Sequence, residues 1–90
     1  MLLITYELAG TGRTAADRAR LRARIGASGP WAQLTEHAFV VQTDETPEQV
    51  RDALLAELEV REDRLFVGTL ADRAAWHNVI APSTWLKGHL

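Results

Sequence analysis

The chain has 90 residues, which is enough for one domain with one modest hydrophobic core. Its composition, 47% hydrophobic and 24% charged, is typical of a globular protein and excludes an intrinsically disordered chain. The sequence has no cysteine and a formal net charge of −2, so it excludes disulfide bonds, thiolate metal sites and cysteine nucleophiles, and its overall charge does not indicate a nucleic-acid binder.

The sequence contains no segment that is expected to enter a membrane. Its longest apolar runs, Leu2–Ile4 and Ala38–Val41, are far shorter than the roughly 20 residues that a membrane-spanning helix needs. No basic segment precedes the first run, and Glu7 follows it closely, so the pattern of a secretory signal is missing. We therefore expect a cytoplasmic protein.

The first third of the chain predicts a strand and then a basic helix. Residues Met1–Leu8 alternate with a period of two, and both faces are largely apolar, which favours a central strand. Thr14 is the expected N-cap of a helix that runs to about Ala27. Leu21 and Ile25 form the narrow apolar stripe of this helix, and arginines flank the stripe on both sides.

The middle of the chain predicts a hairpin. Trp31–Thr35 is a short strand candidate, and Ala38–Thr43 is a better one because apolar and β-branched residues dominate it. Glu36 and His37 separate the two segments and are expected to form the turn between them.

The last part of the chain predicts a helix, a strand and a helical tail. Thr46 and Gln49 have the spacing of a capping box, and Pro47 fits the first helical position. Leu65–Leu70 is the final strand candidate, and Ser83–Leu90 is expected to be a short C-terminal helix.

This order of elements predicts a single α+β domain over residues 1–90 with the ferredoxin-like βαββαβ fold. Two right-handed crossovers joined by a hairpin give a four-stranded antiparallel sheet in the order 4-1-3-2, with both main helices on one face. The other face would still carry apolar side chains from the central strands. We expect a partner subunit, the C-terminal tail, or both in a symmetric dimer to cover that face.

Charge is distributed unevenly along the chain. The first helix is basic, whereas the segment from Glu36 to Asp63 holds nine acidic residues against two arginines. The arginines can bind nucleic-acid phosphates or an acidic protein partner, or they can pair with the acidic second helix; no exposed aromatic side chain is expected beside them. The candidate phosphate-binding residues are Arg13, Arg18, Arg20, Arg22 and Arg24.

Several segments resemble a family of short bacterial proteins labelled SinR, which are similar in turn to the small ferredoxin-fold subunit of the CRISPR spacer-acquisition complex and to VapD-type toxin ribonucleases. The resemblance covers nearly the whole chain. Most matched positions are apolar, and the distinctive signals are Thr-Asp, Asp-Arg and the terminal Trp-Leu-Lys. The matching segments are Ile4-Thr5-Tyr6-Glu7-Leu8, Trp31-x-x-Leu34, Phe39-Val40-Val41-Gln42-Thr43-Asp44, Glu48-Gln49-Val50-Arg51-Asp52-Ala53-Leu54, Asp63-Arg64-Leu65-Phe66-Val67 and Thr84-Trp85-Leu86-Lys87-Gly88-His89-Leu90.

The resemblance implies a homodimer and a divalent-metal-dependent endoribonuclease that uses an acid at the end of the first strand. That position is usually aspartate in the related nucleases and is Glu7 here, one methylene longer, so Glu7 is the candidate ligand for Mg²⁺ or Mn²⁺. Many relatives use the fold as a scaffold without catalysis.

The predicted topology brings Glu7 to the starts of its neighbouring strands, beside His37 and beside Asp63 or Arg64. Glu7, His37 and Asp63 are therefore the candidate catalytic residues, and a surface ion pair between Glu7 and Arg64 is the alternative. The expected dimer contacts are Trp85, Leu86 and Leu90 on the C-terminal helix.

Three functions remain open from the sequence. The first is a homodimeric, non-catalytic module, similar to the CRISPR subunit and to VapD, that is associated with nucleic acid or linked to antiviral defence. The second is a metal-dependent ribonuclease. The third is a protein-interaction module that binds no nucleic acid.

Overall fold

The structure is a computed structural model, and it describes residues 1–9, 15–58, 62–71 and 73–90. All six β and α elements of the predicted βαββαβ order are present, and a short helix follows them. The elements in chain order are β1 (Leu2–Glu7), α1 (Ala15–Gly26), β2 (Trp31–Thr35), β3 (Ala38–Val41), α2 (Pro47–Leu55), β4 (Arg64–Thr69) and α3 (Ser83–His89).

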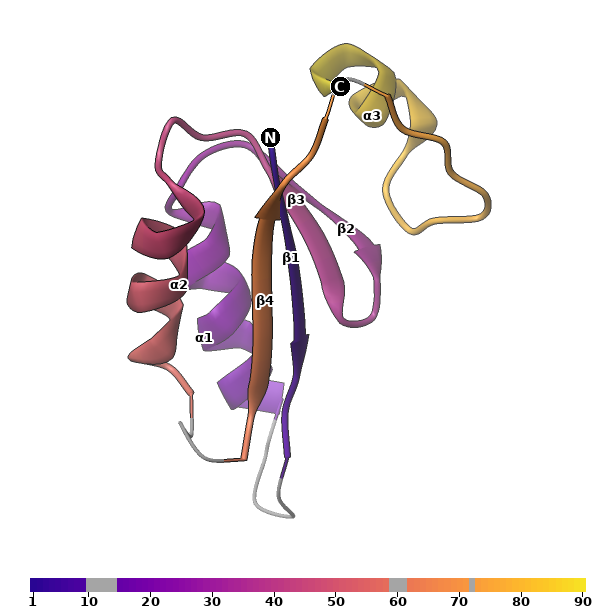
Figure 1. Cartoon of the computed structure of the whole chain (residues 1–90). Helices are drawn as coiled ribbons and strands as arrows, with labels where there is room; N and C mark the ends of the chain where they lie inside the picture. Colours follow the sequence, from indigo (N-terminus) through magenta and orange to yellow (C-terminus); the bar gives the residue numbers. More distant parts are fainter. Residues whose placement is uncertain (10–14, 59–61, 72) are drawn as a thin grey trace.

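The four strands form one sheet in the order β2-β3-β1-β4, which is the predicted 4-1-3-2 order read from the other edge. Each neighbouring pair is antiparallel. Figure 1 shows α1 and α2 side by side on one face of this sheet, while α3 lies on the opposite side. The ferredoxin-like fold expected from the sequence is confirmed.

The main core lies between the sheet and the two long helices. Leu21 and Ile25, the predicted stripe of α1, are buried here, as are Val50 and Leu54 of α2. Alternation along the strands places every second side chain on this face. The buried strand residues of this core are Leu2, Ile4, Tyr6, Phe39 and Val41.

A second, smaller core lies on the face of the sheet away from α1 and α2. Leu86 of α3 and Ala81, just before it, are buried there against Val40 of β3 and Ala32 of β2. The backbone N–H of Ile80 also donates to the carbonyl of Leu34 (2.9 Å), which fastens the C-terminal segment to the edge strand β2. From the sequence, a partner subunit, the C-terminal tail or both could cover this face. Within the single chain, the C-terminal segment covers the half of the face that lies near the start of β1 (Figure 1).

Element boundaries differ from the sequence prediction by one or two residues, as is usual for strand ends. β1 ends at Glu7, β3 ends at Val41 and β4 begins at Arg64 and ends at Thr69. The expected cap at Thr14 lies outside the described residues. In the described ranges, the structure contains no helix whose length and hydropathy would let it cross a bilayer.

The predicted capping box of α2 is present. The backbone N–H of Gln49 donates to Thr46 Oγ1 (3.1 Å), and the backbone N–H of Thr46 donates to Gln49 Oε1 (2.8 Å). The substitution Thr46→Ala removes the first of these bonds, and we expect it to lower the free energy of unfolding by about 1 kcal/mol. Urea denaturation measures the change, and Thr84→Ala, at an exposed position of α3, is the control.

Candidate functional site

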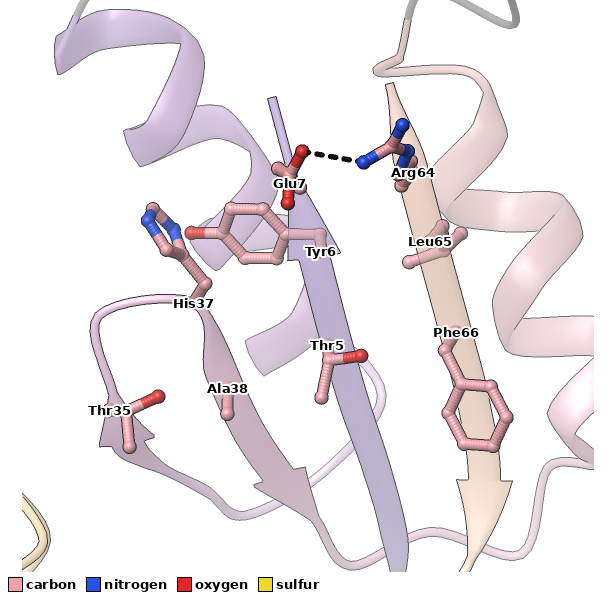
Figure 2. A pocket seen from close by; sticks show the side chains of 9 residues that line it. All are labelled: Thr5, Tyr6, Glu7, Thr35, His37, Ala38, Arg64, Leu65 and Phe66. Carbon is pink, nitrogen blue, oxygen red and sulfur yellow. Dashed lines mark hydrogen bonds and ion pairs between the residues drawn. The ribbon is translucent and has the colours of Figure 1, made fainter. Parts of the chain in front are cut away.

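The half of the sheet face that the C-terminal segment leaves uncovered contains a shallow hollow of about 370 Å³. It lies at the end of β1 and the starts of β3 and β4 (Figure 2). The residues that line the hollow are Thr5, Tyr6, Glu7, Thr35, His37, Ala38, Arg64, Leu65 and Phe66.

Strand register explains why these side chains meet. Thr5 pairs with Ala38 on one side and with Phe66 on the other, and Glu7 pairs with Arg64. Residues that pair directly across antiparallel strands project to the same face, so these five side chains share the uncovered face. The two rows form the floor of the hollow.

Phe66 is the large apolar side chain of this floor, and it is 60% exposed. Its ring leans along β4 over Gly68, since a Cβ atom added at Gly68 would lie 2.8 Å from Cε1 of Phe66. Gly68 is the next residue of β4 on the same face, and it has no side chain to fill the space beside Phe66. Gly68 therefore allows the Phe66 ring to lie against the strand.

Glu7 and Arg64 form an ion pair at the rim of the hollow. Arg64 Nη1 donates to Glu7 Oε1 at 3.0 Å, and the two side chains remain 80% and 66% exposed, respectively. A pair this exposed adds roughly 0–1 kcal/mol to stability. This ion pair is the alternative that the sequence had left open for Glu7.

The other two candidate catalytic residues are placed differently. His37 is exposed in the β2–β3 turn and lines the hollow on the side away from Arg64. The Asp63 carboxylate accepts a hydrogen bond from the backbone N–H of Ala9 at 2.8 Å, so it ties the end of β1 to the start of β4. Over the described ranges, no three His, Cys, Asp or Glu side chains lie close enough together to hold a metal ion.

Tyr6 lies between the hollow and the helix-covered core. Its ring stacks on the ring of Phe39, with 5.7 Å between ring centroids, and makes an edge contact with the His37 ring at the same centroid distance. Its hydroxyl is buried, points toward His37 (Figure 2), and has no hydrogen-bond partner among the described residues. Burial raises the pKa of this hydroxyl, while the positive charges of Arg22 and Arg18 lower the pKa and the charge of Glu36 raises it.

The arginines of α1 divide between the two sides of the apolar stripe. Arg20 Nε lies 3.8 Å from Oε2 of Glu57, a residue beyond the end of α2. Arg20 also forms an ion pair with Asp17. Arg18 and Arg22, which we call the arginine flank, act electrostatically on Tyr6 instead. Arg20 therefore reaches the acidic segment of its own chain, as one of the two interpretations of the basic helix expected. Arg24 is half-buried, and Arg13 lies outside the described residues.

The three expected dimer residues have different environments in the single chain. Leu86 is 1% exposed and belongs to the second core. Trp85 is half-buried, and its ring stacks on His89 with 3.9 Å between ring centroids. Leu90 is 43% exposed. Leu86 is thus already buried by its own chain, and Leu90 and the exposed part of Trp85 are what α3 presents to a partner.

Phe66 is the site residue that was not predicted from the sequence, where it counted only as part of the last strand. The signal was present in the alternation of β4, which puts Leu65 and Val67 toward the helices and Phe66 on the other face. The sequence alone did not indicate which side chains of this strand are covered. The structure shows that the cover of the second face stops short of Phe66.

No family model matches the chain, and no curated protein matches it. Among solved structures, the chain is similar to the crystal structure of hypothetical protein TT1823 from Thermus thermophilus, with a TM-score of 0.63. The two share 14% sequence identity, and the match covers 90% of this chain and 94% of the other. At this identity the likeness supports the fold alone.

Proposed function

We propose that this protein is a small non-catalytic module that binds nucleic acid through the phosphate backbone. The observation that carries the proposal is that, in the described ranges, Arg20 forms an ion pair with the acidic segment after α2 whereas Arg18 and Arg22 form none with it. Guanidinium groups form forked, charge-assisted hydrogen bonds with phosphate oxygens. Arg18 and Arg22 are one helical turn apart, so both project from the same side of α1.

The surroundings of Glu7 favour a module that does not cut its nucleic acid. Oε1 of Glu7 is bound by Arg64, and Asp63 holds the backbone of Ala9. Both carboxylates therefore have structural partners. Arg64 adds a further guanidinium, mostly exposed, at the rim of the hollow.

The resemblance to the CRISPR spacer-acquisition subunit and to VapD-type proteins supports a role in nucleic-acid biology and antiviral defence. It also implies a homodimer, which stays a prediction. In such a dimer, Leu90, just after α3, and the exposed part of Trp85 are the expected contacts that the single chain leaves available.

The test compares two sets of arginine substitutions on the same helix. We expect the double variant Arg18→Gln/Arg22→Gln to weaken binding of a single-stranded RNA by about tenfold or more, because each charge-assisted bond to phosphate contributes on the order of 1 kcal/mol. The plot of log affinity against log salt concentration becomes less steep by about 1.4, or roughly 0.7 for each lost contact. Fluorescence anisotropy between about 50 and about 200 mM salt measures both quantities.

Arg20→Gln is the matched control because Arg20 already pairs with Asp17 and Glu57. Its binding and salt dependence should stay close to those of the unmodified protein. An equal loss of RNA affinity in the double variant and in Arg20→Gln would mean that binding depends only on the net charge of α1, and would contradict a specific role for Arg18 and Arg22. Absence of binding at about 50 mM salt would contradict the proposed function and leave the protein-interaction module as the better account.

A further inference from the structure

The hollow on the uncovered sheet face has the features of a base-binding site. It combines one exposed aromatic ring, from Phe66, with polar groups around it, among them the Thr5 hydroxyl and the exposed Arg64 guanidinium. Every nucleobase has a flat π-face that stacks on such a ring, and a neighbouring arginine can bind the phosphate that follows.

We propose that this hollow binds an unpaired base of a single-stranded nucleic acid, stacked on the ring of Phe66. This inference rests on the proposed function and adds the class of nucleic acid, because a base inside a duplex is stacked on its neighbours and offers no free face. Arg64 lines the same hollow, so one strand can place a base on Phe66 and a neighbouring phosphate on Arg64.

The chemistry of the hollow favours a nucleic acid over a second copy of this chain. The core of a stable protein interface is depleted of charged residues, and it buries roughly 800 Å² of each partner. Here the ring of Phe66 lies beside Arg64 and Glu7, which are mostly exposed and charged. A flat base covers a single ring and leaves such groups hydrated or paired with phosphate.

Gly68 is the positioning residue of this site. The absence of a side chain at Gly68 lets the Phe66 ring lie along the strand and present its outer face to solvent. A methyl group there would meet the flexible end of the Phe66 side chain and would push the ring away from the strand, while the backbone of β4 remains acceptable to alanine. The substitution Gly68→Ala therefore changes the position of the ring without removing it.

The experiment measures binding of a short single-stranded RNA and of the matching duplex by fluorescence anisotropy. We expect Phe66→Leu to lower affinity for the single strand by roughly 5- to 150-fold, the range for loss of one base–aromatic stack, and to leave duplex affinity unchanged. Phe66→Trp keeps an aromatic ring and should keep its affinity for the single strand.

Gly68→Ala should lower single-strand affinity several-fold while the free energy of unfolding does not fall. A fluorescent base analogue in the RNA should be quenched by the protein with Phe66 and not by Phe66→Leu.

The chain offers a matched control for each substitution. Ile80 is 62% exposed, close to the 60% of Phe66, so Ile80→Ala removes a similarly exposed apolar side chain outside the hollow. A Cβ atom at Gly88 meets nothing within 4 Å, so Gly88→Ala adds the same methyl group at an open place. Both controls should bind single-stranded RNA as the unmodified protein does.

The outcomes separate the inference from the proposed function. If Phe66→Leu binds single-stranded RNA normally, or if single strand and duplex bind equally while Arg18→Gln/Arg22→Gln weakens both, the base site is wrong and backbone binding stands. If the Phe66 or Gly68 variants change the molecular mass measured by light scattering, the face is an interface between copies, and the base site is overturned. If no nucleic acid binds at low salt, the base site and the proposed function are both wrong.

Discussion

Substitution of Leu86 by alanine is expected to lower the free energy of unfolding by about 2–5 kcal/mol, the usual cost of removing a fully buried leucine side chain. Leu86 is 1% exposed and packs against Val40 and Ala32 in the second core. The helix that carries it has seven residues, too few for a stable helix on its own. Packing through Leu86 is therefore what holds α3 on the sheet.

The packing around Leu86 is already incomplete. An apolar cavity of about 380 Å³ already lies between the C-terminal segment and the sheet, with Leu3, Trp76 and Leu86 in its wall. Loss of the Leu86 side chain enlarges this cavity, and we expect α3 to detach before the main core unfolds. Urea denaturation followed by tryptophan fluorescence measures the change, because Trp76 and Trp85 both pack against the second core.

Leu90→Ala is the matched control for this measurement. Leu90 is on the same terminal segment but is 43% exposed, so its removal should cost less than about 1 kcal/mol. Equal destabilisation by the two substitutions would show that α3 does not anchor itself through Leu86. A variant with a detached α3 should also associate with itself, since Leu3 and Val40 then become accessible to solvent.

Tyr6→Phe is expected to stabilise the protein by about 1–2 kcal/mol at neutral pH. The Tyr6 side chain is buried, and its hydroxyl has no hydrogen-bond partner in the described part of the chain, a situation that costs roughly 1–3 kcal/mol. Phenylalanine keeps the ring that stacks on Phe39 and His37 while it removes the unpaired hydroxyl. Thermal or urea denaturation at neutral pH tests this, and a destabilised variant would show that the hydroxyl has a bonding partner in solution.

The same hydroxyl makes stability depend on alkaline pH. Burial raises the pKa of Tyr6 above its ordinary value of 10.0, so the unfolded chain loses the phenolic proton at a lower pH than the folded chain does. The folded state then binds more protons, and stability falls as pH rises above about 10. Below that pH the contribution is fully present. The chain has one tyrosine, so the ultraviolet absorbance of phenolate reports this group alone, and Tyr6→Phe should lose this part of the alkaline dependence.

Local sequence signals were sufficient to predict most of the fold. The capping box at Thr46 and Gln49 marked the start of α2, and the Leu21/Ile25 stripe marked the buried side of α1; both are as expected. These features depend on neighbours along the chain, so spacing reveals them. The position of α3 over the sheet depends instead on contacts between residues more than 40 positions apart, such as Leu86 with Val40, which no local pattern specifies.

The candidate site was only partly predictable for the same reason. The antiparallel order of the strands correctly placed Glu7 beside Arg64, because register follows from topology. Exposure of Phe66 depends on how far the C-terminal segment extends over the sheet, and the strand sequence alone does not contain that information. The two flanks of α1 were visible in the helix periodicity, but which flank meets Glu57 depends on where α2 packs.

The arrangement of the second core has a consequence for biosynthesis. Residues Ala81 and Leu86, which cover Val40 and Leu3, follow every strand of the sheet in chain order. A nascent chain emerging from the ribosome can therefore pair all four strands and pack both long helices before the cover of the second face exists. During that interval the incomplete domain exposes aliphatic side chains to solvent, and this is when cotranslational chaperones have the most apolar surface to bind.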